Sequence, residues 1–358
     1  MKTQPSILIT GPLPPPAGGI SIHINRLAER LKNKYLLEFV DESPVKKSSH
    51  FNMRSFHILK YWRLVANADL IFIHSGNRLF KAIHILHAKL FKKKMIITLH
   101  GYGHKRNILT RYWDSWLYNF ADVIILVNEL IKQKLSLDEK KTIVRHAFIP
   151  PILENEPPLP EDLEKQLEED REKGMCILCG NASRLDSFQG EDLYGLDMIL
   201  ELMKYLREKK IPAVIYFNVS AMDAGKDRFD AANEWIVQYN LKEHIRLSNQ
   251  SLSFVKLMER SDIMLRPTIT DGDSLSIREA IALNKQVITS DAVERPDNCH
   301  LFQNRNQNSL NEKTGRVIDQ FFEHQSKDTV IKNVPITEVY DDFYLKLLDD
   351  VLNSKIKQ

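Results

Sequence analysis

One segment of the chain combines acids, hydroxyl groups and a glycine where a predicted strand passes into a predicted helix. It reads Arg266-Pro267-Thr268-Ile269-Thr270-Asp271-Gly272-Asp273-Ser274-Leu275-Ser276-Ile277-Arg278-Glu279-Ala280. A helix that begins near Ser274 directs its first backbone amides, those of 274–276, toward an anion such as a phosphate. Asp271 in the loop and Glu279 in the helix can then reach opposite ends of one ligand, one at sugar hydroxyls and the other at a ribose. Either acid alone fits a helix cap or a solvated charge, but the combination favours a ligand site.

Two further segments have the chemistry of a binding loop. The first predicted strand, Ser6–Thr10, is followed by a proline-rich stretch, by Gly18-Gly19 and by a helix. Adjacent glycines let backbone amides approach an anion, although a tight turn that needs a positive φ is the better explanation of this loop taken alone. The dinucleotide fingerprint G-x-G-x-x-G is absent. A later strand ends at His100-Gly101, where an imidazole can bond a hydroxyl or a phosphate oxygen or can be purely structural.

The elements that must position these residues alternate between short β-branched runs and amphipathic stretches, which predicts βαβ units and parallel sheets. The strands expected in the first half are 6–10, 70–74, 95–99 and 123–127, with helices such as 20–31 and 113–120. A break at Pro150-Pro151 and an acidic stretch, 154–173, precede a second alternation. Its expected strands are 175–179, 213–218, 245–247, 263–266 and 287–289. We therefore expect an α/β protein with two Rossmann-like, doubly wound parallel-sheet domains facing a central cleft, followed by an amphipathic helix at 336–354.

Composition excludes several classes of protein. The chain has 358 residues, 43% hydrophobic and 27% charged, which is the balance of a folded globular protein of about two domains. Three cysteines indicate a reducing compartment, and Cys176 and Cys179 fit a buried strand better than a redox or metal pair. No apolar run approaches the ~20 residues that span a bilayer. We expect a cytoplasmic protein.

The charge is divided unevenly. Residues 1–150 contain 24 Lys/Arg and 10 Asp/Glu, whereas the remainder contains 26 and 37, so the net charge of +3 hides a basic half and an acidic half. Between Ser43 and Trp113 the only acid is Asp69. A basic half with interleaved aromatic residues predicts contact with an anionic membrane surface or another anionic acceptor, against the alternative of a solvated lysine-rich face. No nucleic-acid-binding motif accompanies it, so nucleic acid is not an expected partner.

The segment around Asp271 resembles the E-x7-E loop and helix of retaining glycosyltransferases with the GT-B fold, the family called GT4. The likeness continues through the stretch 280–290, Ala-Ile-Ala-Leu-Asn-Lys-Gln-Val-Ile-Thr-Ser, and Gly18-Gly19 and His100-Gly101 fall where that family has its glycine loop and its N-domain histidine. The resemblance implies an acceptor-binding domain over 1–152, a nucleotide-sugar-binding domain over 153–335 and a C-terminal helix over 336–358 that packs back toward the first domain.

The resemblance also implies roles for individual residues. Glu279 would bind the ribose, Asp271 the transferred sugar, and His100 would take part in catalysis with these two acids. The implied donor-binding set is Arg184, Arg266, Gly272, Asp273, Ser274, Leu275, Ser276 and Glu279. Two departures from the family pattern stand out: aspartate replaces glutamate at 271, and Tyr194 stands where the family has a diphosphate-binding lysine.

The activity implied is transfer of a sugar, with retention at the anomeric carbon, from a nucleotide-diphosphate donor to a glycan or lipid-linked acceptor. Cell-surface polysaccharide biosynthesis at the inner face of the cytoplasmic membrane would be its setting. The family is described as using front-face attack, in which the leaving diphosphate helps to deprotonate the acceptor. Such a reaction needs no D-x-D or metal-ligand cluster, so we expect no metal and no cofactor. The alternatives are an inactive scaffold subunit of the same fold, a nucleotide-sugar epimerase and, disfavoured by the missing glycine fingerprint, a nicotinamide dehydrogenase.

Overall fold

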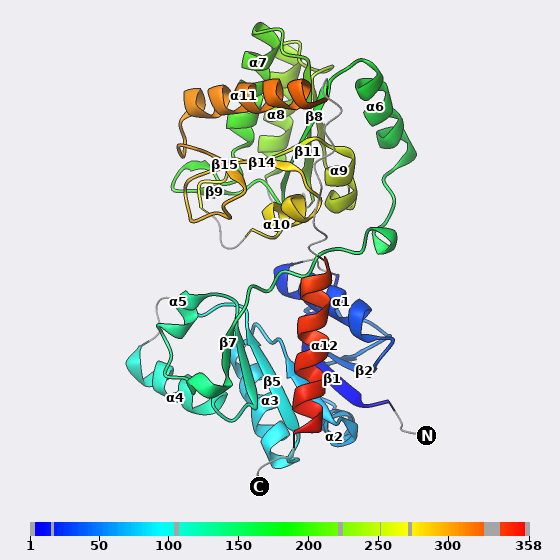
Figure 1. Cartoon of the computed structure of the whole chain (residues 1–358), viewed down its shortest axis with the longest axis vertical. Coiled ribbons are helices and arrows are strands. Elements are labelled where there is room, and N and C mark those ends of the chain that lie inside the picture. Colours follow the sequence, from blue (N-terminus) through cyan, green and yellow to red (C-terminus); the bar gives the residue numbers. More distant parts are fainter. Residues whose placement is uncertain are drawn as a thin grey trace. The chain divides into compact units, whose positions relative to one another are not determined.

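The chain folds into two compact units. The computed structural model describes residues 4–15, 18–103, 107–220, 225–250, 252–270, 274–325 and 337–354. One unit comprises Met1–Pro150 with Ile336–Gln358 and the other Pro151–Pro335, so the division falls two residues before the boundary expected from the sequence. Figure 1 shows the two units with their elements labelled. No helix in the described ranges combines the length and apolar character needed to cross a membrane.

The first unit is built on one seven-stranded sheet in which every neighbouring pair is parallel. The strands are β1 (Ser6–Gly11), β2 (Leu36–Asp41), β3 (Phe51–Asn52), β4 (Leu70–Ile73), β5 (Lys94–Leu99), β6 (Val123–Leu126) and β7 (Thr142–Val144). The helices are α1 (Gly19–Leu31), α2 (Ile58–Asn67), α3 (Arg78–Leu90), α4 (Ile108–Tyr118), α5 (Glu129–Lys132) and α12 (Thr337–Asn353). The strand order is β3-β2-β1-β4-β5-β6-β7.

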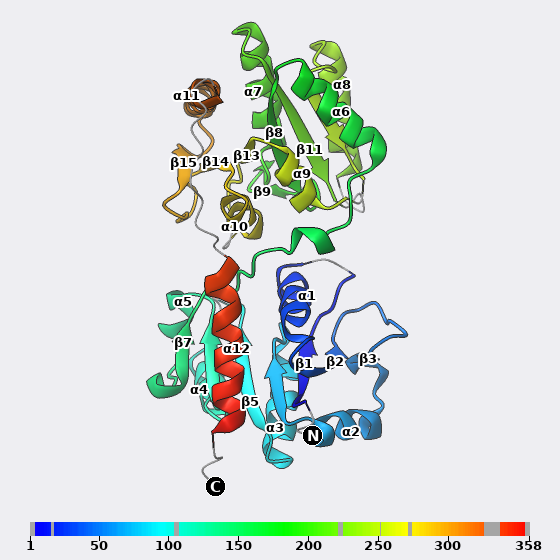
Figure 2. The ribbon, with the colours of Figure 1, turned by 45° about the vertical axis from the view of Figure 1, so that its right-hand side comes forward.

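Helices cover both faces of this sheet because alternate side chains of each buried strand point to opposite sides. Leu8 of β1 belongs to the core that packs against α2, α3, α4 and α5. Its neighbours Ile7 and Ile9 belong to the opposite core, which includes α1 and four buried residues of α12. Those four residues are Tyr344, Leu347, Leu348 and Val351. Figure 2 shows α12, in red, running along this sheet, so the last helix completes the fold of the first unit.

The second unit repeats the plan with a six-stranded parallel sheet in the order β12-β11-β8-β13-β14-β15. Its strands are β8 (Cys176–Ala182), β11 (Ala213–Val219), β12 (Ile245–Ser248), β13 (Ile263–Arg266), β14 (Gln286–Ser290) and β15 (Cys299–Phe302), and β9 (Ser187–Phe188) and β10 (Glu191–Asp192) form a hairpin. The helices are α6 (Glu161–Glu172), α7 (Leu196–Glu208), α8 (Lys226–Gln238), α9 (Phe254–Arg260), α10 (Leu275–Ala282) and α11 (Gln307–Gln325). Three short 3₁₀ helices complete the two units, at Met53–Ser55, Glu139–Lys141 and Leu153–Asn155.

The second sheet is also buried on both faces. One core contains α7, α8 and α11, and the other contains α6, α9 and α10. Cys176 and Cys179 of β8 are free, fully buried thiols, one in each core. Burial raises the pKa of Cys179 to about 12 and that of Cys176 further, which confirms that both cysteines are structural rather than reactive.

Both sheets follow the order 3-2-1-4-5-6 of the Rossmann fold when their strands are numbered within each unit. The predicted fold class, α/β with two Rossmann-like doubly wound domains, is therefore confirmed. In such sheets the strand order reverses between the first and fourth strands, and ligands bind outside the carboxyl ends of the strands at this switch point. The switch points lie between β1 and β4 in the first unit and between β8 and β13 in the second.

Candidate functional site

The switch point of the second unit gathers polar and cationic groups. Arg266 is the last residue of β13, and its Nη1 lies 3.3 Å from both the backbone oxygen and the side-chain oxygen of Asn181 in β8. Its guanidinium carbon lies 5.0 Å from the centroid of the Tyr194 ring. A guanidinium held flat on an aromatic ring keeps its charge while its orientation is fixed. The sequence predicted Arg266 as a donor-binding residue, and the structure adds Asn181 and Tyr194 as the groups that orient it.

Tyr194 is tied into the same corner by its hydroxyl group. Its Oη lies 2.6 Å from Ser183 Oγ, next to Arg184. Arg184 Nε donates to Asp186 Oδ2 at 2.8 Å, and about half of the Arg184 side chain is exposed. The loop that follows β8 therefore carries Arg184, paired with Asp186, beside the residues that hold Tyr194.

A glycine holds the two loops of this corner in close contact. Gly195 has φ +70° and precedes α7, and a Cβ placed there would lie 2.4 Å from the Pro267 carbonyl oxygen. Asp192 Oδ1 accepts hydrogen bonds from the backbone amides of Tyr194 and Gly195 at 2.9 Å each. Burial, followed by the nearby Asp197 carboxylate, raises the pKa of Asp192. Only glycine at position 195 lets the loop that carries Tyr194 lie this close to Pro267.

The helix that carries Glu279 begins as the sequence predicts. Ser274 is the N-cap of α10, and Leu275 and Ser276 are its first two residues. Ser274, Ser276 and Glu279 are buried, and the hydroxyl oxygens of the two serines lie 3.2 Å apart. Burying a carboxylate costs free energy unless it has partners. Glu279 is buried, so it is not a solvated surface charge. Asp271, Gly272 and Asp273 lie outside the described residues.

The glycine loop of the first unit leads directly into α1. Gly18 is the N-cap with φ −157°, an extended conformation open to any residue. Its amide donates to Ser21 Oγ at 2.8 Å, and Ser21 Oγ donates back to the Gly18 carbonyl at 3.0 Å. A Cβ on Gly19 would meet no atom of the described residues within 4 Å. A required positive φ therefore does not explain Gly18.

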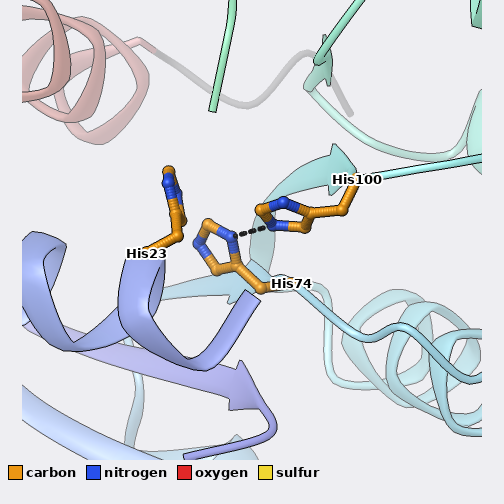
Figure 3. Close-up of side chains that lie close together, drawn as sticks. All are labelled: His23, His74 and His100. Carbon is orange, nitrogen blue, oxygen red and sulfur yellow. Dashed lines mark hydrogen bonds between the residues drawn. The ribbon is translucent and has the colours of Figure 1, made fainter. Parts of the chain in front are cut away.

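His100 follows β5 at the carboxyl edge of the first sheet and does not lie alone. Its Nε2 is 3.1 Å from Nδ1 of His74, which follows β4, and the ring of His23 in α1 packs against both (Figure 3). Burial, with the charge of His23 next, lowers the pKa of His100 well below its usual range. Sequence reasoning singled out His100 but gave no weight to His74 and did not consider His23. The carboxyl ends of neighbouring parallel strands lie at the same edge of a sheet, and this is the signal that links His74, after β4, to His100, after β5.

A separate hollow of about 550 Å³ lies at the β12 edge of the second unit, against α6 and α8, with Tyr216 and Arg246 in its wall. None of the residues predicted from the sequence for the site lines it, and we do not include it in the candidate site.

Comparison with known proteins shows which proteins share this fold. No protein-family model matches the sequence, and no curated protein matches it. Among solved structures, a glycosyltransferase from Rickettsia africae superposes with a TM-score of 0.70 at 19% identity, covering 98% of this chain and 100% of that one. HepE from Anabaena, solved in complex with UDP and glucose, gives 0.64 at 15% identity over 96% and 99% of the two chains. Sucrose-phosphate synthase from Thermosynechococcus elongatus gives 0.58 at 13% identity over 97% and 100%. The chain therefore has the GT-B fold of glycosyltransferases, as the sequence predicted.

Proposed function

We propose that this protein is a retaining glycosyltransferase that moves a sugar from a nucleotide-diphosphate donor to a glycan or lipid-linked acceptor. The observation that carries the proposal is the corner of the second unit where Arg266 is held by Asn181 and Tyr194, in the same unit as the buried Glu279 of α10. The fold supports the same activity, because HepE is described in complex with UDP-glucose.

The donor would be bound by the second unit. Arg184 and Arg266 supply positive charge for the diphosphate, and the N-terminal amides of α10 supply hydrogen-bond donors. The Glu279 carboxylate accepts hydrogen bonds from the ribose hydroxyls, and Asp271 contacts the transferred sugar. Tyr194, in place of the family's lysine, contributes by fixing Arg266 rather than by its own charge. The diphosphate is thereby bound by charges and dipoles of the chain itself.

Transfer would then proceed on one face of the sugar. The bond from the anomeric carbon to the diphosphate oxygen breaks while the acceptor oxygen bonds to that carbon from the same side, and the acceptor's proton passes to the leaving diphosphate. Catalysis rests on stabilising the departing negative charge and on positioning two substrates. Arg184, Arg266 and the amides at 274–276 serve the first purpose, whereas His100 and the Gly18-Gly19 loop serve the second on the acceptor side.

A panel of UDP-, GDP-, ADP- and dTDP-sugars, screened by thermal shift, tests donor binding. We expect stabilisation by one nucleotide family and its loss in Glu279→Gln. Glu201→Gln is the matched control, because Glu201 is an exposed glutamate of the neighbouring helix α7. A shift with no nucleotide, or an equal shift in both variants, would contradict the assignment of the donor site.

We also propose that the first unit binds an anionic membrane surface, with cell-surface polysaccharide biosynthesis as the setting. Helix α4 exposes apolar and aromatic side chains, among them Trp113 at 58%, and neighbouring segments carry the basic residues described above. Aromatic side chains favour the lipid interface, and each cation near an anionic surface adds about 1 kcal/mol.

Sedimentation with liposomes tests the membrane proposal. We expect vesicles that contain phosphatidylglycerol to retain the protein at low salt, and Trp113→Ser with Trp116→Ser to weaken that retention. Equal retention on neutral and anionic vesicles, or none on either, would refute it.

A further inference from the structure

Three histidine rings converge at the switch point of the first sheet (Figure 3). The ring centroids of His23 and His74 are 5.0 Å apart, those of His23 and His100 are also 5.0 Å apart, and those of His74 and His100 are 5.4 Å apart. One ring nitrogen from each residue lies within 4.8 Å of the other two. The three side chains come from α1, from the end of β4 and from the end of β5, so three separate segments contribute to one point.

The backbone brings α1 unusually close to this point. Gly11 ends β1 with φ +152°, and a Cβ placed there would lie 2.6 Å from Ile24 Cδ1 and 3.3 Å from His74 Cβ. A side chain at position 11 would therefore have to displace the end of the Ile24 side chain and would crowd His74.

Hydrogen bonding fixes the state of one ring and leaves two nitrogens without a partner. His23 Nδ1 lies 2.5 Å from the Ala147 carbonyl oxygen, which can only accept, so Nδ1 carries the hydrogen and Nε2 carries a lone pair. His23 Nε2 and His74 Nε2 are both buried and make no hydrogen bond, in residues that are 3% and 0% exposed. A buried polar atom without a partner costs roughly 1–3 kcal/mol, and its presence in a native fold calls for an explanation.

A metal ion bound through His23 Nε2 would give that buried lone pair a partner. Imidazole ligands bind metals through a neutral ring, and a metal-ligating histidine commonly donates its other nitrogen to a carbonyl or carboxylate, as His23 does to Ala147. Three imidazoles with a vacant fourth position are a recognised set for zinc.

We propose that His23, His74 and His100 bind one divalent transition-metal ion, zinc by preference, with a fourth position open to an oxygen ligand. In a tetrahedral site with Zn–N of about 2.0–2.1 Å the ligand nitrogens are roughly 3.3 Å apart. His74 Nδ1 and His100 Nε2 are already 3.1 Å apart, and the wider separations close by movements on the order of 1 Å.

This proposal departs from the expectation of no metal, which rested on a transfer reaction that needs no metal-ligand cluster and on the lack of a second ligand pair at metal spacing beside Cys176 and Cys179. Positions 23, 74 and 100 are too far apart in sequence to show such spacing. The ion would lie in the first unit, whereas the residues proposed to bind the donor diphosphate belong to the second. Evidence for or against sugar transfer therefore does not decide whether the metal site exists. In the proposed transferase the open position would be on the acceptor side, where it could orient an acceptor oxygen.

Titration of zinc chloride into the full chain, freed of metal with a chelator, tests the proposal by calorimetry. We expect one ion per chain, and a dissociation constant at least ~100-fold weaker in His23→Gln and in His100→Gln. His324→Gln is the control, because His324 is an exposed histidine whose Nδ1 bonds within α11 to the Gln320 carbonyl. Circular dichroism establishes that each variant is folded before titration.

Cobalt substitution gives a second readout that does not depend on affinity. We expect the wild-type chain to show the intense visible bands of four-coordinate cobalt, and the His100→Gln variant to lose them. Weak binding that is unchanged in both variants, or bands that disappear equally in His324→Gln, would overturn the proposal. Full metal binding with no nucleotide binding would refute the donor site and leave this inference intact.

Discussion

Replacement of Gly195 by alanine tests how the corner around Arg266 is supported. The new residue would keep a φ near +70°, which costs an L-residue about 1 kcal/mol. Its Cβ would also lie 2.4 Å from the Pro267 carbonyl oxygen, 2.8 Å from Pro267 Cγ and 3.0 Å from Pro267 Cβ. Backbone atoms cannot swing away as a flexible side chain can, so relief requires a shift of the loop, at a cost of about 2 kcal/mol more.

Gly190 provides the matched control. It has φ +86° in the turn between β9 and β10, but a Cβ there would meet nothing within 4 Å. Gly190→Ala therefore isolates the conformational cost of about 1 kcal/mol, whereas Gly195→Ala should lower the free energy of unfolding by about 3 kcal/mol. For a unit of this size these values correspond to a fall in Tm of about 3 °C and about 10 °C.

The assay is thermal unfolding followed by hydrogen exchange, because exchange shows which unit is affected. We expect faster exchange at the start of α7 and in the peptide that contains Pro267 in Gly195→Ala only, together with weaker nucleotide binding, since Arg266 adjoins the displaced proline. If Gly190→Ala and Gly195→Ala lowered the Tm equally, the contact with Pro267 would contribute nothing and the reasoning would be refuted.

Three other perturbations have defined outcomes. Asp41 is fully buried and accepts hydrogen bonds from Leu13 N, Ser43 N, Ser43 Oγ and Lys47 Nζ. Asp41→Asn should lower the free energy of unfolding of the first unit by about 3 kcal/mol in urea. A variant as stable as the wild type would contradict this expectation. Burial raises the pKa of Asp41, but the hydrogen bonds from Lys47 and the other donors outweigh burial and lower the pKa overall. The stability that the ionised Asp41 contributes is therefore present above about pH 4 and should be lost as the pH falls below that value. Unfolding at pH 7 and at pH 3 measures this loss. Tyr35→Phe removes a 2.7 Å hydrogen bond to Asp349 Oδ1 and should lower the free energy of unfolding by about 1 kcal/mol, with faster amide exchange confined to α12. Unchanged exchange in α12 would show that this bond does not hold the helix in place. Arg266→Lys loses the flat contact with Tyr194 and should weaken nucleotide affinity about tenfold in calorimetry without lowering the Tm, whereas an unchanged affinity would remove Arg266 from the donor site.

Most of the strands that the sequence predicted are buried along their length, with the partly buried edge strand β12 as an exception. The buried run Ile7–Ile9 is readable because a central parallel strand is apolar throughout. The strands missed were β2, β3, β7 and β15, together with the short hairpin strands β9 and β10. Residues of β2 alternate between exposed and intermediate before becoming buried, and β3 has only two residues. Edge and near-edge strands are held by pairing more than by an apolar run, so pattern alone does not reveal them.

The start of α4 shows another limit. The apolar pattern predicted a helix from Trp113, but the helix begins at Ile108 because the side chain of Asn107 accepts a hydrogen bond from the Thr110 amide. A capping residue, rather than periodicity, sets the boundary. The exposed Ile108 and Leu109 of its first turn disrupt the pattern of a core-facing helix, and the same residues extend its apolar outer surface.

The candidate site was predictable where its residues lie close together in sequence. Ser274, Ser276 and Glu279 belong to one helix, and their spacing places them together whatever the rest of the chain does. The contact of Arg266 with Asn181 depends instead on β13 pairing with β8, and the meeting of His23 with His74 depends on the end of β1 and the path of α1. Strand order is set by packing of the whole domain, so sequence spacing does not contain it.

The measurement that tests the central claim most directly is transfer itself, with the nucleotide sugar selected by the thermal-shift panel, a lipid-linked or glycan acceptor, and product analysis by NMR. The account predicts a product with the anomeric configuration of the donor, formed only with acceptor present, and turnover lost in Asp271→Ala and in Glu279→Ala. Intact turnover in both variants, an inverted product, or conversion of the donor sugar without any acceptor would contradict it.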